Sequence, residues 1–130
     1  SRVSGSTVTE TLLSDGSVVG KNTKIERSVI GIRSIIGKNV QIEGSVVMGA
    51  DWYEIPEHKV HNRKYNILDV GIGDNCVIKN AIIDKNARIG KNCRIVNEAN
   101  VQERSGTNYN IVDGVVIVHK NATLPDGTVI

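Results

Sequence analysis

The chain has 130 residues, of which 39% are hydrophobic and only 3% aromatic, with no Phe. This length suits a single domain, residues 1–130, and the lack of large rings favours a core of narrow layers of Val, Ile and Leu. The net charge of +2 comes from basic residues spread along the chain, and no apolar run could span a bilayer or form a signal peptide. We therefore expect neither nucleic acid nor a membrane as a partner.

Apolar residues recur every six positions in the first part of the chain. The series consists of Leu13, Val19, Ile25, Ile30, Ile36, Ile42 and Met48. The residue after the apolar one is often Gly, and Asn commonly follows two positions later, as in Gly20 and Asn22. Because Gly and Asn tolerate a positive φ, each repeat predicts a short strand and a sharp corner, with the apolar side chain facing inward.

Residues 49–71 interrupt this rhythm. They contain the single Trp, two of the three Tyr and two of the three His, together with Pro56. We expect a long loop that leaves a corner of the repeat structure. Loops on a rigid scaffold often carry function, and a linker or packing flap is an equally good interpretation.

A second series follows the loop. It consists of Ile72, Ile78, Ile83, Ile89, Ile95 and Val101. Its five-residue step from Ile78 to Ile83 matches the step from Ile25 to Ile30, so the two series superpose with an offset of 53 residues. Cys76 and Cys93 occupy equivalent places without zinc-motif spacing, and we interpret them as buried thiols.

The last part of the chain contains a polar break at residues 103–114 and then a short third series. We expect the break to be a second, shorter loop. The third series is Val118, Leu124 and Ile130. It extends the same repeat to the end of the sequence.

Together the three series predict an all-β solenoid. Three sixes make a triangular coil of about 18 residues, and roughly five to six coils at about 4.8 Å spacing give a prism on the order of 25–30 Å long. An α-helix is excluded because six is not a multiple of 3.6 and Gly recurs throughout. The pattern does not fix the handedness, since parallel crossovers are normally right-handed.

Two enzyme classes on such scaffolds depend on histidine. A hexapeptide-repeat acyltransferase, acting as a trimer, would use a His as general base, and the candidates are His58, His61 and His119. None has a supporting carboxylate at recognisable spacing. A zinc hydratase would need three His to converge on one ion, but two of the three lie together in the loop. We assign no catalytic residue and no metal site.

Several strings resemble a known family. They are residues 47–54 (VMGADWYE), 82–90 (IIDKNARIG), 100–103 (NVQE) and 114–130 (GVVIVHKNATLPDGTVI). They are similar to the C-terminal domain of ADP-glucose pyrophosphorylase (glucose-1-phosphate adenylyltransferase), closest to the plant and cyanobacterial type, from about residue 13 onward. The resemblance implies a single-stranded left-handed parallel β-helix of hexapeptide repeats.

The resemblance also implies a function. The family enzyme makes ADP-glucose and pyrophosphate from ATP and glucose 1-phosphate, for starch or glycogen, with ATP and Mg used by an N-terminal catalytic domain. This chain has no Gly-rich nucleotide loop, so it would carry no cofactor itself, and whether it is an enzyme alone stays open. It would be the regulatory and assembly domain.

Phosphorylated effectors, 3-phosphoglycerate and inorganic phosphate, bind the family's β-helix near its junction with the catalytic domain. Lys85 and Lys120 match the family's effector-binding positions, and Arg88 and His119 are secondary candidates that could add charge. Lys85 lies two residues after Ile83, as Lys120 does after Val118, so we expect related edges for both. A Lys ammonium suits phosphate, although most lysines at solenoid corners are simply solvated.

The residues around the two breaks depart from the family pattern, which leaves the effector open. The family enzyme is a tetramer, so we expect the catalytic domain and a homo- or hetero-oligomer as partners; open β-helix ends also favour self-association. The sequence starts at Ser1 without Met, so we expect a longer natural chain. The expected compartment is the cytoplasm, or the plastid in a plant or alga.

Overall fold

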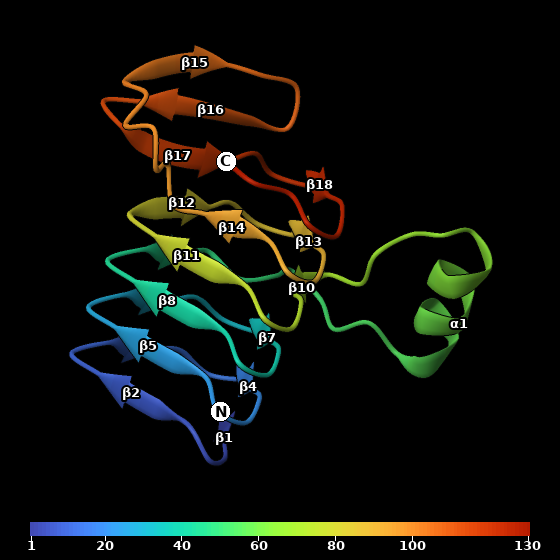
Figure 1. Cartoon of the computed structure of the whole chain (residues 1–130). Helices are drawn as coiled ribbons and strands as arrows, with labels where there is room; N and C mark the ends of the chain where they lie inside the picture. The colour runs from blue at the N-terminus through green and yellow to red at the C-terminus, as the bar shows by residue number, and fades with distance from the viewer.

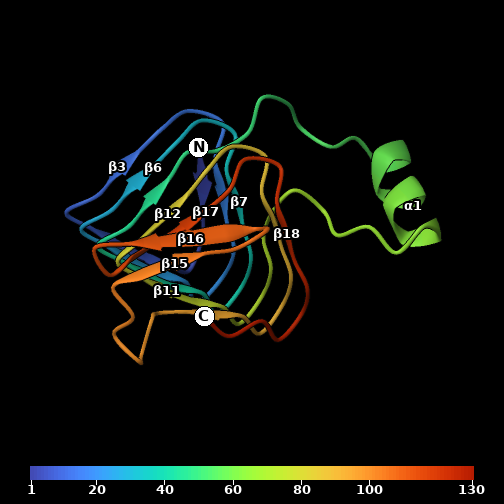
Figure 2. The ribbon, with the colours of Figure 1, turned by 90° about the horizontal axis from the view of Figure 1, so that it is seen from above.

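A computed structural model describes residues 1–130 as a parallel β-helix from which one arm projects. Three sheets form the walls of a triangular stack of coils (Figure 1), and Figure 2 shows this outline from above. We call this part the coil stack, and we call residues 49–70, which leave it and return, the arm. The expected all-β solenoid with a long insertion is therefore confirmed.

Each wall consists of short strands hydrogen-bonded in a row. The first sheet contains β1 (Arg2–Val3), β4 (Val18–Val19), β7 (Ile35–Ile36), β10 (Gly71–Ile72), β13 (Arg88–Ile89) and β18 (Thr123–Leu124). The second contains β2 (Thr7–Thr9), β5 (Lys24–Glu26), β8 (Gln41–Glu43), β11 (Val77–Lys79) and β14 (Arg94–Ile95). The third contains β3 (Leu12–Leu13), β6 (Val29–Ile30), β9 (Val46–Val47), β12 (Ala81–Ile83), β17 (Val115–Val118), β16 (Tyr109–Val112) and β15 (Glu103–Ser105). Successive coils pair in parallel, so each wall is a single sheet.

One inward residue from each strand fills the core. The buried aliphatic side chains include Ile25, Ile30, Ile42, Ile78 and Ile95, and the buried thiols Cys76 and Cys93 lie among them unpaired. Burial raises the pKa of Cys76 to about 12, so its thiol stays protonated. The interpretation of both cysteines as buried thiols is confirmed.

The coil is shorter than expected. Val19 pairs with Ile36 and Ile30 with Val47, which gives a coil of 17 residues rather than about 18, because one of its three corners is a five-residue step. The step from Ile42 to Val47 is also a five-residue step. The assignment of Met48 to the inward series was therefore wrong, since Met48 is 41% exposed and Val47 is buried.

Serine hydroxyls complete the shorter corner. The Ser28 hydroxyl oxygen accepts a hydrogen bond from the Ser45 N–H at 3.2 Å, and the Ser45 hydroxyl accepts one from the Ala81 N–H at 3.1 Å. These side chains satisfy buried backbone donors from coil to coil. The longer corners behave as predicted, since their asparagines adopt φ between 58° and 63°: Asn22, Asn39, Asn75, Asn92 and Asn121.

The expected second loop, residues 103–114, is instead mostly strand. β15 and β16 form an antiparallel hairpin that continues through a tight turn at Asp113–Gly114 into β17. Asp113 and Gly114 have φ of 50° and 78°, and an Asp-Gly pair between apolar strands is a strong hairpin signal. Ile111 is buried, so the hairpin covers one end of the core.

The first expected loop, residues 49–71, lies outside the coils but is not entirely loop. It contains α1 (Pro56–Lys64), which begins at Pro56 and has Glu57 in its first turn and Arg63 and Lys64 in its last. Gly71 belongs to β10. No helix in the structure has the length and apolar character of a membrane span.

Candidate functional site

Lys85 and Lys120 lie on one edge of the coil stack, one coil apart. β12 and β17 are paired in register up to Ile83 and Val118, and the Asn121 N–H donates to the Lys85 carbonyl at 3.0 Å. The two lysines therefore start from equivalent corners, as their spacing predicts. Lys120 is exposed and the Lys85 side chain is 42% exposed.

Asp51, the third residue of the arm, lies against this pair. The Lys85 Nζ is 3.3 Å from the Asp51 Oδ1, and the Asn86 Nδ2 donates to the Asp51 Oδ2 at 3.1 Å. The Asp51 N–H in turn donates to the Asn86 Oδ1 at 2.9 Å. The hydrogen bond from Asn86, then that from Lys85, and the charges of Lys85 and Lys120 lower the pKa of Asp51. Asp51 is thus a carboxylate at ordinary pH, held at the edge where the lysines converge.

Arg88 has a different environment from the two lysines. Its Nη1 donates to the Glu54 Oε2 at 3.1 Å and to the Leu68 carbonyl at 2.6 Å, and so connects both ends of the arm to β13. Burial raises the pKa of Glu54, but hydrogen bonds from Val70, Asn62 and Arg88 outweigh it, so the net shift is downward. In this structure Arg88 anchors the arm and does not face the lysine edge.

The histidines do not converge. His119 follows β17, and its Nδ1 lies 3.1 Å from the Thr107 carbonyl oxygen in the hairpin connection. His58 and His61 lie on α1, and the His61 ring packs against Tyr65 with the ring centroids 4.7 Å apart and the planes tilted by 46°. No group of three His, Cys, Asp or Glu side chains in the structure is arranged to hold a metal ion.

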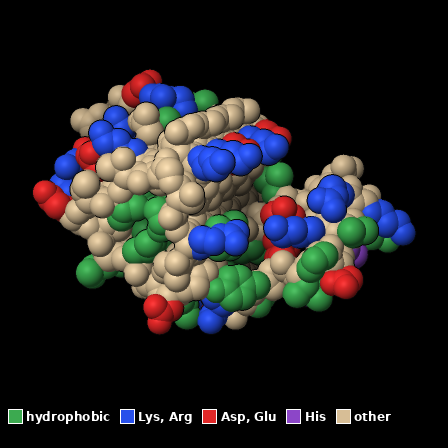
Figure 3. All heavy atoms as spheres, turned by 90° about the horizontal axis from the view of Figure 1, so that it is seen from below, with side chains coloured by type: hydrophobic (Ala, Val, Ile, Leu, Met, Phe, Trp, Pro, Cys, Tyr) green, Lys and Arg blue, Asp and Glu red, His purple; other side chains and the backbone are tan.

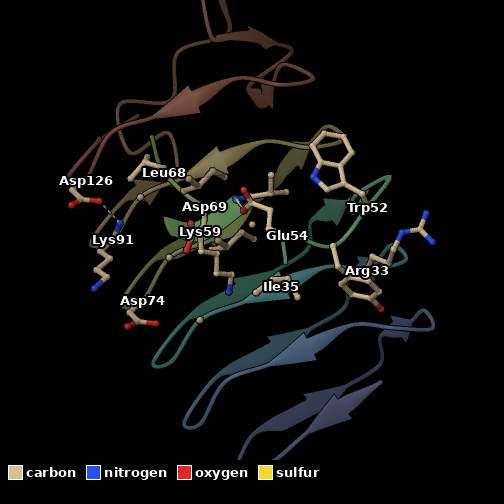
Figure 4. A pocket seen from close by; sticks show the side chains of 18 residues that line it. Arg33, Ile35, Trp52, Glu54, Lys59, Leu68, Asp69, Asp74, Lys91 and Asp126 are labelled. Carbon is tan, nitrogen blue, oxygen red and sulfur yellow. Dashed lines mark hydrogen bonds between the residues drawn. The ribbon is translucent and has the colours of Figure 1, made fainter. Parts of the chain in front are cut away.

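A pocket of about 340 Å³ opens between the arm and the first sheet (Figure 4). Trp52 and Arg33 lie toward one end, and Asp74, Lys91 and Asp126 lie toward the other. The Asp74 Oδ1 accepts the Lys38 N–H at 2.9 Å, and the Asp126 Oδ1 accepts the Lys91 N–H at 2.8 Å. These carboxylates close corners of the neighbouring coils.

Glycines in the pocket lining let neighbouring coils stack closely. A Cβ on Gly90 would lie 2.3 Å from the Asp126 Oδ1 and 2.6 Å from the Asp126 backbone nitrogen, which no side chain tolerates. Lys59, from α1, also lines the pocket and has no ion-pair partner in the structure. Sequence reasoning missed this pocket because it depends on where the arm folds back. The uneven residue composition of the loop was the only available signal.

The arm mixes charges and apolar side chains on its surface. Seen from below, it stands beside the coil stack with basic, acidic and hydrophobic side chains close together (Figure 3). Six of its large hydrophobic side chains are exposed: Trp52, Tyr53, Ile55, Val60, Tyr65 and Ile67.

The lysine edge is the arrangement with the clearest chemistry. Lys85 and Lys120 carry ammonium groups at stacked corners, and the Asn86 amide follows Lys85 in the same corner. Ammonium and amide N–H groups are donors that suit a phosphate. The edge offers no nucleophile paired with a base.

Comparison with known proteins places the chain beside one kind of β-helix. Residues 1–129 match the family model described as the GLGC left-handed parallel beta-helix domain. The chain is 47% identical over 132 residues to the glucose-1-phosphate adenylyltransferase small subunit, chloroplastic/amyloplastic, of Triticum aestivum. That alignment covers 100% of this chain and 28% of the wheat protein, so the chain spans just over a quarter of this relative's length. The match also confirms the left hand of the helix, which periodicity left open.

Proposed function

Because this chain belongs to the family of GLGC left-handed parallel β-helix domains, we propose that it is the regulatory and assembly domain of a glucose-1-phosphate adenylyltransferase. The parent enzyme would convert ATP and glucose 1-phosphate to ADP-glucose and pyrophosphate on a separate catalytic domain, with Mg as cofactor. The chain's own task would be to bind phosphorylated effectors, 3-phosphoglycerate or inorganic phosphate, and to hold subunits or domains together.

The observation that carries the effector proposal is the pair of stacked lysines. Lys85 and Lys120 occupy equivalent corners of adjacent coils, so their side chains reach the same region of solvent. A ligand with several anionic oxygens can contact both, and each such contact is a charge-assisted hydrogen bond. Lys21 and Lys38 form a second stacked pair at another corner, since the Asn39 N–H donates to the Lys21 carbonyl at 3.0 Å. The choice of Lys85 and Lys120 therefore also rests on their resemblance to the family's effector-binding positions.

The third sheet supports the assembly proposal. Its outward residues form an in-register row without charge: Leu12, Val29, Val46, Ile82 and Ile117. Leu12 is 71% exposed, Val29 41% and Val46 37%. The corresponding row of the second sheet contains Lys24, Gln41 and Arg94. An exposed aliphatic row on one wall alone marks a contact surface, and we propose that the rest of the parent enzyme covers it.

The compartment follows from the parent enzyme. We propose the plastid if the organism is a plant or alga, as the name of the wheat relative states for that protein, and the cytoplasm otherwise.

Titration calorimetry with 3-phosphoglycerate and with inorganic phosphate tests the effector site. Lys85→Ala and Lys120→Ala should each weaken binding by roughly tenfold, the loss of one charge-assisted contact. Lys21→Ala and Lys38→Ala, at another corner, are matched controls and should leave binding unchanged. The same four variants in the full-length enzyme should show the same pattern in the effector concentration that gives half-activation. Binding that is indifferent to Lys85 and Lys120, or equally sensitive to Lys21, would overturn the proposal.

A further inference from the structure

Asp51 lies against Lys85, one of the two lysines of the proposed effector site. Its carboxylate already accepts hydrogen bonds from the Lys85 ammonium at 3.3 Å and the Asn86 amide at 3.1 Å. We propose that Asp51 is a built-in competitor for the lysine edge, which a bound phosphate group must displace from Lys85. This inference rests on the proposed effector site and adds how that site is regulated.

The geometry makes the exchange feasible. The Asp51 side chain is 45% exposed and that of Lys85 is 42% exposed, so an anion can approach both from solvent. The pair is single and open, and such exposed ion pairs contribute little net stability. A phosphate has more anionic oxygens than a carboxylate, so it can contact Lys85 and Lys120 at once. The Asn86 Nδ2, released from the Asp51 carboxylate, becomes a third donor for it.

Displacement of Asp51 has a consequence for the arm. Asp51 precedes Trp52 and lies three residues before Glu54, which Arg88 fixes to β13. Lys85 and Asn86 therefore contact the same short segment of the arm that Arg88 contacts. When Asp51 leaves Lys85, its carboxylate moves next to Trp52 while the backbone of this segment stays attached at both ends. Phosphate binding would then change the surroundings of Trp52 and the mouth of the pocket beneath it.

The surroundings of Asp51 also explain why the exchange is local. The Asp51 N–H remains bound to the Asn86 Oδ1 at 2.9 Å, and the Arg33 Nε holds the Ala50 carbonyl at 2.9 Å. These bonds do not involve the carboxylate. The backbone at the start of the arm therefore stays in place while the side chain moves away.

Asp51→Asn is the direct test. It keeps the side-chain shape and removes the competing charge, so inorganic phosphate should bind about two- to fivefold more tightly, the range expected for one exposed ion pair. Asp15→Asn, a charge removal at the same edge but in an earlier coil, is the matched control and should leave the affinity unchanged. Trp52 is the only Trp in the chain, so its fluorescence should change with phosphate in the natural chain and much less in Asp51→Asn.

The outcomes separate this inference from the effector site itself. Phosphate binding that depends on Lys85 but is unchanged or weakened by Asp51→Asn would overturn the competitor role and leave the site intact. An equal gain in Asp15→Asn would also overturn it, since the effect would then be general electrostatics. If phosphate binds to neither the natural chain nor Asp51→Asn, the effector site and the competitor both fall.

Discussion

The coil stack is held together by repeated contacts, whereas the arm is held by contacts that occur only once. Each coil of the stack repeats the one before it, so every strand has a paired neighbour and the inward side chains of the inner coils pack between two similar ones. The arm has a single buried residue on its helix, Asn62, and is attached to the stack by a few polar contacts, chiefly those of Glu54 with Arg88 and of Asp51 with Lys85 and Asn86. The stability of the stack is therefore shared among many similar contacts, whereas the position of the arm depends on a few unique ones.

The largest expected effect comes from breaking a layer of the stack. Ile83 is 3% exposed and faces the core from β12, while Ile82 of the same strand faces outward. Ile83→Ala should lower the free energy of unfolding by about 2–5 kcal/mol, because it removes buried methyl groups and leaves a cavity. Ile82→Ala should cost less than about 1 kcal/mol. Urea unfolding followed by circular dichroism measures both, and similar losses for the two would contradict the assigned face of each residue.

The next effect should be confined to the arm. Arg88→Ala removes the partner of Glu54, whose side chain is only 6% exposed, and the donor to the Leu68 carbonyl. The free energy of arm opening should fall by about 1.5–3 kcal/mol. Trypsin cleavage at Lys59, Arg63 and Lys64 should then accelerate roughly tenfold to a hundredfold.

Arg94→Ala is the matched control for the arm variant. Arg94 forms an exposed pair with Glu98 at 2.9 Å in the coil stack, and its loss should not change cleavage of the arm. If Arg88→Ala instead weakens phosphate binding and leaves the arm protected, Arg88 belongs to the effector site and not to the anchor.

A smaller effect should come from the corners, and it again separates the two regions. Asn92 has φ of 60° at a corner of the stack, and Asn66 has φ of 56° in the arm. Ala at either site should cost about 1–2 kcal/mol, because it lacks the short polar side chain that lets Asn tolerate this conformation, and Gly should be nearly neutral. Asn92→Ala should lower the melting temperature of the whole stack. Asn66→Ala should increase hydrogen exchange in the arm alone, and a global loss of stability there would contradict the separation.

The same contrast explains what the sequence could predict. The coils could be predicted from the sequence because one rule, which places Gly and Asn at the corner and an aliphatic residue inward, applies to most repeats. The error at Met48 arose because the only sequence signal of this five-residue step is the corner serine, Ser45. The hairpin at 103–114 had a clear signal in Asp113–Gly114, which the search for six-residue periodicity overlooked.

The candidate site shows where sequence reasoning stops. Position within the coil placed Lys85 and Lys120 on one edge correctly, because equivalent residues of a solenoid stack. Nothing in the local sequence indicated that Asp51 returns to that edge or that Arg88 turns to Glu54, since both contacts join residues 34 positions apart. Such contacts depend on the path of the arm, which has no repeat to reveal it.

The smallest effect is expected from the loss of one charge, that of Glu54, on protonation. Glu54 has a lowered pKa in the folded chain, so its ionised form stabilises the arm. That contribution is fully present above the ordinary pKa of 4.5 and is lost as the pH falls through the lowered value. Acidification should therefore loosen the arm before it unfolds the aliphatic stack. Trp52 fluorescence should report the first step and far-ultraviolet circular dichroism the second. In Glu54→Gln the arm should already be loosened at neutral pH and the first step should vanish. A single transition shared by both probes in the natural chain would mean that the arm and the stack form one cooperative unit.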